Sequence, residues 1–460
     1  MTNVIEFSKA AKEASIIPIL SEVELASRFV AKHHHELRYV AKWGQWFRYD
    51  GKVWREEATL WAFDAARGVC REAAAETEQR GEIKSTTSAK VIAAVERIAK
   101  ADRLIAATVD QWDRDPWLLN TPGGTIDLKT GKSRPHDPND YITKITAVSP
   151  DKKCKCPIWK KHLKKVLVDD GVIRFVQEYW GYSLTGDTKE DVWCFAHGDG
   201  RNGKDTTMET ITGILGDYHK VAPIETFTVT RSEQHPTDLA MLRGARLVTV
   251  SEVEKGQRWA EAKIKRLTGG SPVVARFMRQ DYFEYTPEFK LWISGNNKPH
   301  FRSIDEATRA RVHMIPFEVT IPKKERDPDF PKKLRPEWPG ILHLLIEALL
   351  SWQKRGGFDT PEKIRAATEK YLQSELGLQD WIEECCILDR ESWSETQQLF
   401  DYWKGHREVA NQYVGTLMAF IEMLDKASEE LGLTKWNHPK TRRAGYQGIK
   451  LVGKKPVPPM

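Results

Sequence analysis

The chain has 460 residues, of which 40% are hydrophobic and 30% are charged, and this composition is typical of a globular protein with two or three domains. Its 71 basic and 65 acidic residues leave a net charge of +6, which permits a nucleic-acid partner without requiring one. Six cysteines in a chain of this length do not form a disulfide framework, so a small secreted scaffold is excluded.

The first 150 residues predict a flexible tail followed by a mixed α+β domain. Residues 1–15 are polar and lack the apolar core and the cleavage site of a signal peptide. Within residues 16–150, helical spacing precedes an alternating aromatic stretch around Asp50 and Gly51, which predicts a β-hairpin. Two alanine-rich stretches, roughly 60–80 and 85–100, favour helices. The Gly-, Pro- and Asn-rich residues 117–144 favour short strands joined by tight turns.

Residues that could bind a metal or span a membrane have simpler explanations. Consecutive histidines at 33–35 would point in different directions on a helix, so a solvated helix end is favoured over a metal site. The cysteine pairs at 154–156 and 385–386 lack partners at zinc spacing and are interpreted as buried or incidental thiols. The longest apolar run, residues 341–352, is too short to cross a bilayer and contains Glu347. We therefore expect a cytoplasmic protein with no membrane partner.

The segment FAHGDGRNGKDTT, residues 195–207, has the glycine and lysine spacing of a phosphate-binding loop. Spacing alone is weak evidence, but an apolar run before the segment predicts a buried strand, and helical spacing follows it. Loop N–H groups would then face the phosphates, and Lys204 would reach the β and γ phosphates. The predicted nucleotide-binding residues are Gly198, Asp199, Gly200, Arg201, Asn202, Gly203, Lys204, Asp205 and Thr206.

Three further polar side chains stand beside predicted strands. Glu252 follows the apolar run 247–250, and a carboxylate there could hold Mg²⁺ and polarise the attacking water. Asn296 follows a second buried run, where its amide could bond to the γ phosphate. Arg311 precedes another strand, and a guanidinium stabilises a highly charged transition state, often from a neighbouring subunit. Taken singly, an acidic loop or a structural arginine would explain them, but together with Lys204 they predict a catalytic set.

Together these segments resemble the helicase module of phage, plasmid and poxvirus primase–helicases, which belongs to helicase superfamily III. The resemblance covers most of the chain and rests on WLLNTPGGTIDLKTGKSRPHDPNDYITK, GDGRNGKDT, SEVEKG, a stretch ending in LWISGNNKP, and DEATRARVHMIPF. It implies an α/β fold with an AAA+-like, three-layer P-loop ATPase at residues 151–325. A helical connector at 326–376 and a winged-helix-like DNA-binding domain at 377–460 would follow.

For function, the resemblance implies a hexameric ring that hydrolyses ATP with Mg²⁺ between its subunits. Such a ring moves along single-stranded or forked DNA during replication of a phage, prophage or plasmid-like element. Lys204 matches the Walker A lysine, Glu252 the Walker B acid, Asn296 the sensor asparagine and Arg311 the arginine finger, whereas Arg309 stands where relatives often have an aromatic residue. No primase active site is recognisable in the first 150 residues, so we expect primer synthesis to require a separate primase.

Asp205 departs from the pattern of this family, because that position normally carries a Ser or Thr whose hydroxyl binds Mg²⁺. A carboxylate is also a good magnesium ligand, but its charge would repel the triphosphate when no metal is bound. Thr206 could supply a hydroxyl, although one step along a helix turns a side chain by about 100°. With Glu252 and Asn296 intact, a working site is favoured over a dead one. Asp205 and Glu252 are then the metal-binding residues, and ATP binding should depend strongly on divalent metal.

Two basic segments are candidate DNA contacts. In VVARFMRQDYFEY, Arg276 and Arg279 flank an apolar tip that a ring would present to DNA in its channel. The alternative is a surface hairpin in which an arginine pairs with Asp281 or Glu284. The basic tail KTRRAGYQGIKLVGKK predicts a β-hairpin that either contacts DNA or is simply solvated. Its candidate phosphate contacts are Lys440, Arg442 and Arg443.

Two other classes of protein fit part of this pattern. A non-motor DNA-binding or replication-initiation protein would carry a degenerate loop and hydrolyse no ATP. A small-molecule P-loop kinase would work as a monomer and would need no arginine finger from a neighbour. ATP hydrolysis with and without single-stranded DNA separates the first class, and size in solution with nucleotide separates the second.

Overall fold

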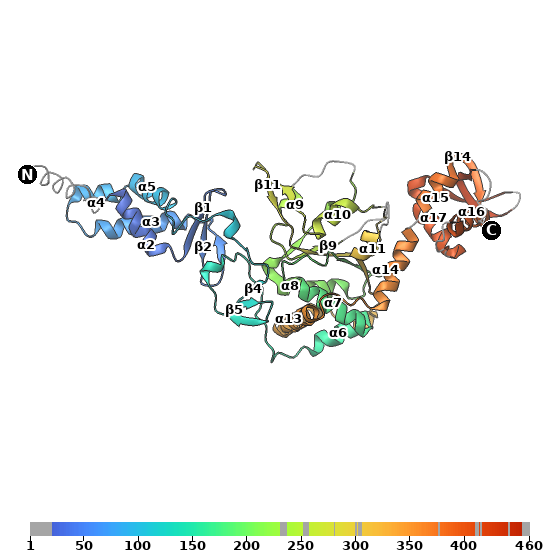
Figure 1. The fold of residues 1–460 in the computed structure, drawn as a ribbon, viewed down its shortest axis with the longest axis horizontal. Coiled ribbons are helices and arrows are strands. Elements are labelled where there is room, and N and C mark those ends of the chain that lie inside the picture. The colour runs from blue at the N-terminus through green and yellow to red at the C-terminus, as the bar shows by residue number, and fades with distance from the viewer. Residues whose placement is uncertain are drawn as a thin grey trace, which may run out of the picture. The chain divides into compact units, whose positions relative to one another are not determined.

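Figure 1 shows the computed structural model, coloured from the N-terminus to the C-terminus. The structure describes residues 21–230, 237–251, 257–279, 281–299, 301, 306–375, 378–409, 414, 416–439 and 442–452. The chain divides into two compact units, Met1–Ser149 and Pro150–Met460. Within the described residues, no helix combines the length and the apolar character that crossing a membrane requires.

Four α-helices and a small antiparallel sheet form most of the described part of the N-terminal unit, which begins at residue 21. The helices are α2 (Glu22–His33), α3 (Trp61–Ala74), α4 (Arg80–Thr86) and α5 (Ala89–Ala99). The sheet has the order β1-β2-β3 and consists of β1 (Leu37–Val40), β2 (Gln45–Tyr49) and β3 (Trp54–Glu56). The predicted hairpin is confirmed, because β2 pairs with β3 and Asp50 Oδ1 accepts the Val53 N–H at 2.9 Å in the turn.

The expectation of two alanine-rich helices is wrong in one respect, because a third helix, α4, lies between α3 and α5. The break before α5 has a local cause: Ser88 accepts the Val91 N–H and starts a new helix. At the histidines, α2 ends with a buried His33 whose Nδ1 lies 2.9 Å from Glu36 Oε1. Among the described residues, no group of three or more His, Cys, Asp or Glu could hold a metal ion.

A three-stranded meander completes this unit and confirms the short strands expected in residues 117–144. It consists of β4 (Leu118–Thr121), β5 (Gly124–Asp127) and β6 (Lys132–Arg134), and the short helices η1 (Val109–Gln111) and η2 (Pro138–Asp140) flank it. Leu119 and Ile126 are buried beneath the meander. Asp127 closes the turn between β5 and β6 by accepting the Lys129 N–H at 2.9 Å.

A parallel sheet of five strands forms the centre of the second unit, as the predicted α/β class requires. The strands are β7 (Trp193–His197), β8 (His219–Val221), β9 (Leu247–Val250), β12 (Lys290–Gly295) and β13 (Val312–Pro316), in the order β13-β7-β12-β9-β8. The inner strands are almost continuously buried, because helices cover both faces of a parallel sheet. Strand β7 stands where the order reverses, since the chain goes from it to β8 at the far edge and later places β13 on its other side.

Helices lie on both faces of this sheet and make three layers (Figure 1). One face carries α7 (Asp170–Tyr182), which packs on α13 (Trp338–Arg355). The ring centroids of Trp180 in α7 and Trp292 in β12 lie 5.4 Å apart. On the other face, Trp193 and Phe195 of β7 pack with Tyr371 of α14 (Glu362–Glu375) and with α10 (Glu261–Thr268). The remaining short elements are η3 (Gly216–Tyr218), η4 (Ile224–Thr226), α9 (Thr237–Ala240), α11 (Glu306–Arg311), η5 (Lys323–Glu325), α12 (Phe330–Leu334) and η6 (Arg335–Glu337).

Helix α6 (Pro157–Leu167) is fixed by a carboxylate from a distant segment. Pro157 stands in its first turn, and Cys156 supplies no side-chain cap. Instead Glu337, at the end of η6, accepts the backbone N–H groups of Ile158 at 3.0 Å and Trp159 at 2.8 Å. A carboxylate at a helix N-terminus satisfies donors that have no partner within the helix. This contact brings the segment before the sheet against the segment after it, next to the nucleotide loop.

The C-terminal residues form a small α+β domain. Helix α15 (Leu378–Cys385) leads into β14 (Cys386–Glu395), which is followed by α16 (Thr396–Val409), α17 (Leu417–Leu431), β15 (Thr434–Asn437) and β16 (Ala444–Leu451). The antiparallel sheet has the order β14-β16-β15 over a core that includes Trp381, Trp403 and Phe420. The predicted basic hairpin needs correction, because its first strand, β15, precedes the basic segment, and residues 442–443 lie in the turn.

Candidate nucleotide-binding site

The loop after β7 adopts a backbone that only glycine accepts at its first position. Gly198 has φ 149°, and a Cβ there would lie 2.1 Å from the carbonyl oxygen of Phe317, which follows β13. Gly203 has φ 86° and caps α8 (Lys204–Leu215). The predicted order of strand, glycine-rich loop and helix is therefore observed. The loop leads into the first turn of α8, which is the positive end of the helix dipole and suits an anion.

Lys204 lies at the start of α8 and its side chain is buried. Its Nζ donates to the Gly198 carbonyl at 2.6 Å and to Asn296 Oδ1 at 2.9 Å. Asn296 follows β12, which is hydrogen-bonded to β7 along its length, so two adjacent strand ends bring together residues that are far apart in the sequence. Burial lowers the pKa of Lys204, and the neighbouring carboxylates of Asp205 and Asp199 act in the opposite direction.

Two buried side chains that the sequence did not distinguish hold the loop in place. The Asn202 amide nitrogen donates to the Phe317 carbonyl at 3.1 Å, and its oxygen accepts the Lys204 N–H at 3.2 Å. On the other side, His162 Nε2 of α6 lies 2.8 Å from Thr207 Oγ1 of α8. Burial, assisted by the nearby Lys165 cation, lowers the pKa of His162 to about 4, so this imidazole is neutral at physiological pH. Asn202 was predicted only as part of the loop, and His162 only as part of a helix.

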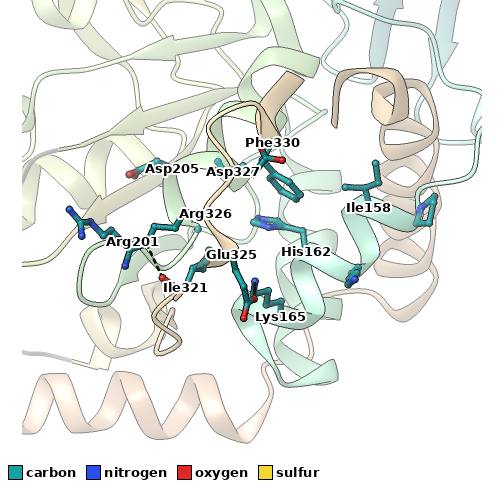
Figure 2. A pocket seen from close by; sticks show the side chains of 14 residues that line it. Ile158, His162, Lys165, Arg201, Asp205, Ile321, Glu325, Arg326, Asp327 and Phe330 are labelled. Carbon is teal, nitrogen blue, oxygen red and sulfur yellow. Dashed lines mark hydrogen bonds and ion pairs between the residues drawn. The ribbon is translucent and has the colours of Figure 1, made fainter. Parts of the chain in front are cut away.

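A cavity of about 790 Å³ opens beside the loop, and Figure 2 shows the side chains that line it. One wall is α6, with Ile158 and His162, and the opposite wall is the segment after β13, with Ile321 and Phe330. The loop and the first turn of α8 close one end with Arg201, Asp205 and Thr206. The cavity thus combines apolar and aromatic side chains with charged ones, which come from α6 and from the segment after β13 as well as from the loop.

Asp205 and Thr206 both line this cavity. Asp205 is exposed and Thr206 half-buried in the first turn of α8. Both residues are thus placed beside the cavity, and which of them would bind Mg²⁺ stays a prediction. Glu252 lies outside the described residues, although β9, which precedes it, ends at Val250 beside β12.

Arg309 and Arg311 lie in α11, just before the amino end of β13, whereas the loop follows the carboxyl end of the neighbouring strand β7. Arg311 ends α11 just before β13, and its Nη2 lies 3.1 Å from Asp191 Oδ2, two residues before β7 begins. Arg309 pairs with Glu369 of α14 at 2.6 Å. β7 and β13 are parallel, so Arg311 lies at the amino end of both strands. The loop follows the carboxyl end of β7, which is roughly 16 Å from the amino end. Arg311 is therefore separated from the loop of its own chain by the length of a strand.

The segment with Arg276 and Arg279 is a hairpin between β10 (Val273–Ala275) and β11 (Phe283–Tyr285). The Arg276 guanidinium stands 4.7 Å from the centroid of the Tyr282 ring. At the tip, Met278 is 74% exposed and Arg279 is also exposed. The structure thus contains the predicted hairpin with an exposed apolar tip and flanking arginines. Its contact with DNA stays a prediction.

The C-terminal basic residues show different environments. Arg443 Nη1 lies 2.8 Å from Glu395 Oε2, so its charge is partly compensated within the domain. Arg442 is exposed in the turn between β15 and β16, and Lys440 lies outside the described residues.

Comparisons with known families cover both units. Residues 26–168 match the family described as "D5 N terminal like", and residues 196–311 match a family of unknown function, DUF5906. The second match begins at Ala196 in β7 and ends at Arg311, so it contains the loop, Asn296 and both candidate arginines.

The chain is also similar to viral proteins. It is 26% identical over 295 residues to "Putative helicase L207/L206" of Acanthamoeba polyphaga mimivirus, covering 59% of this chain and 30% of that protein. It is 24% identical over 296 residues to "Putative helicase 022R" of Frog virus 3 (isolate Goorha), covering 60% of this chain and 29% of that protein. The chain therefore spans about 30% of the length of these relatives.

Among solved structures, the apo structure of the NrS-1 C-terminal region has the same fold. The TM-score is 0.51 at 12% sequence identity, and the alignment covers 90% of this chain and 87% of that one. At this identity the similarity concerns the fold alone.

Proposed function

We propose, on the premise that the chain is a module of the phage and viral primase–helicase type, that it is an ATP-hydrolysing DNA helicase of superfamily III. The meeting of Lys204 and Asn296 at the switch point of the sheet carries this proposal. Ligands of open α/β sheets bind at that position, and the cavity beside the loop has room for a nucleoside. The α and β phosphates would lie against the loop N–H groups, and Lys204 would exchange its carbonyl contact for phosphate oxygens.

In this proposal each predicted residue has one role in ATP hydrolysis. Lys204 binds the β and γ phosphates, Asn296 orients the water or the γ phosphate, and Glu252 activates that water. Asp205 and Glu252 would hold Mg²⁺, which supplies positive charge beside the triphosphate. The exposed Asp205 carboxylate in the first turn of α8 fits that role, because oxygen ligands suit this cation.

The placement of Arg311 supports hydrolysis between subunits. It lies at the edge of the sheet opposite to the loop, so one copy can present it to the next copy's loop in a head-to-tail ring. We propose a hexamer on the strength of the family resemblance. A monomeric P-loop kinase would leave this arginine without a catalytic partner.

DNA is the proposed substrate of the motor, with the β10–β11 hairpin in the channel. The apolar tip and Arg276 could contact a strand without reading its sequence, since the phosphates repeat along it and every base offers a flat face for stacking. The element order of the C-terminal domain, α15-β14-α16-α17-β15-β16, supports the proposed winged helix, with the β15–β16 turn as its wing. A separate primase would supply primers.

The test is ATP hydrolysis by the purified chain with and without single-stranded DNA, together with unwinding of a fluorescently labelled fork. We expect single-stranded DNA to accelerate phosphate release several-fold, and a non-hydrolysable ATP analogue to shift the chain into a ring on light scattering. DNA binding without hydrolysis would support the non-motor class instead. Hydrolysis by a monomer that ignores DNA would support the kinase class.

Asp205→Ser is expected to weaken the dependence of ATP binding on divalent metal. A carboxylate a few Å from the triphosphate costs roughly 1–4 kcal/mol of repulsion when no cation lies between them, which corresponds to about fivefold or more in Kd. The measurement is the Kd of a fluorescent ATP analogue in EDTA and in Mg²⁺. The ratio of the two values should fall about tenfold in the variant. Glu209→Gln is the matched control, because Glu209 is an exposed carboxylate of the same helix α8 but does not line the cavity. An equal ratio in Asp205→Ser and the wild type would remove Asp205 from the metal site.

A further inference from the structure

The N-terminal unit contains a second hollow, of about 560 Å³, on its β4–β6 meander. Trp117 and Asp115 line it just before β4, and Asp127, Lys129, Lys132 and Arg134 line it from β5, the following turn and β6. Trp117 is half-buried, so part of its ring is accessible. Lys129 Nζ stands 5.9 Å from the centroid of that ring, which places a cation and an aromatic face in one hollow.

The acidic groups of this hollow are committed to the local backbone. Asp115 Oδ1 accepts the Trp117 N–H at 2.8 Å, and Asp127 accepts the Lys129 N–H and the Thr130 hydroxyl at 2.9 Å each. These bonds hold both carboxylates in turns, where each replaces a backbone acceptor.

Two of its three cations are available to a ligand. Arg134 is paired with Asp140 at 2.7 Å, but Lys129 and Lys132 are exposed. Within residues 21–230, no carboxylate lies within ion-pair distance of either lysine. The turn that carries them is closed by the Gly131 N–H, which donates to the Asp127 carbonyl at 2.7 Å. Both lysines thus line the same hollow as Trp117, and Lys129 lies beside its ring.

We propose that this hollow binds single-stranded DNA, with one base stacked on Trp117 and the adjoining phosphates on Lys129 and Lys132. Base–aromatic stacking beside cations is the combination by which proteins hold unpaired strands independently of sequence. Duplex DNA would satisfy the lysines but would offer Trp117 no free base. The inference rests on the proposed function only for the choice of DNA as the nucleic acid, and it requires no ATP.

The test uses the full chain without nucleotide and a fluorescein-labelled oligo(dT), with affinity measured by anisotropy over a series of salt concentrations. The double variant Lys129→Glu and Lys132→Glu is expected to weaken binding about tenfold. Two lost phosphate contacts should also reduce the slope of log K against log salt by roughly 1.4. The control is Lys84→Glu with Lys90→Glu, which reverses two exposed lysines on α4 and α5 of the same unit and should leave both quantities unchanged.

A second measurement addresses stacking directly and needs no variant. An oligonucleotide that contains 5-iodouracil is cross-linked to the wild-type chain by light, and the adducts are located by mass spectrometry. We expect an adduct on Trp117. No adduct there, together with equal affinities of the two double variants, would overturn the proposal. Oligo(rU) or a blunt duplex could also bind as tightly as oligo(dT) and be weakened equally by the Lys129→Glu and Lys132→Glu double variant. That result would overturn the choice of single-stranded DNA. A Trp117 adduct on a chain that hydrolyses no ATP would keep this site while the motor proposal fails.

Discussion

Lys204→Ala is expected to abolish ATP hydrolysis, with kcat/KM lowered by roughly a thousandfold. Lys204 Nζ is the cation held between the Gly198 carbonyl and Asn296, at the place where the γ phosphate would lie. The fold should survive, because the substitution removes a buried charge whose desolvation already lowers the pKa of this amine. The measurements are steady-state phosphate release with single-stranded DNA and thermal unfolding of the same preparation.

Lys161→Ala is the matched control for this experiment. Lys161 is an exposed lysine that lines the same cavity from α6 and does not belong to the loop. Its loss should change KM for ATP only modestly and leave kcat unchanged. Hydrolysis by Lys204→Ala at near the wild-type rate would mean that the loop is degenerate, and it would move the chain into the non-motor class.

The strand–loop–helix unit could be predicted because its signals are local. A buried β7, glycines at special φ values and a helical repeat lie within about two dozen consecutive residues, and each agrees with the others. We expected Lys204 and Asn296 to lie close together because each follows the carboxyl end of a strand. This required only that β7 and β12 be parallel, and they are. Their catalytic roles stay predictions.

The walls of the cavity beside the glycine-rich loop could not be predicted in the same way. His162 contacts Thr207 because Glu337 fixes the start of α6, and these residues come from segments before and after the sheet. Helical periodicity shows that α6 has a buried face, but it does not show which helix covers that face. Strand β14 was missed for a different reason: a register shift between Asp389 and Trp393 interrupts the alternation by which a half-buried strand is identified.

Arg311→Ala is expected to lower the rate of ATP hydrolysis by roughly a thousandfold or more while nucleotide binding is retained, as for other arginine fingers. Binding should persist because Arg311 is a strand's length from the loop of its own chain and would act only on the transition state at the next subunit. Phosphate release and the Kd of a fluorescent ATP analogue measure the two effects separately.

The ion pair with Asp191 offers a competing explanation, in which Arg311 merely joins α11 to β7. Asp191→Asn separates the two roles, because it breaks the same ion pair and leaves the guanidinium in place. If Arg311 is the finger, Asp191→Asn keeps most of the activity. If the arginine is structural, both variants lose activity and thermal stability together. Arg309→Ala, which breaks the pair with Glu369 instead, controls for a finger at the neighbouring position.

Mixing two inactive variants tests whether Arg311 acts between subunits. Lys204→Ala subunits retain Arg311, and Arg311→Ala subunits retain Lys204, so a mixed ring contains some interfaces at which both groups are intact. With equal amounts and random assembly, about a quarter of the head-to-tail interfaces combine an intact loop with an intact arginine. Activity should therefore return to a corresponding fraction of the wild-type rate. The mixed rings could instead be as inactive as the rings of either single variant. Arg311 would then not complete a neighbour's site, because both residues would act in the site of their own subunit.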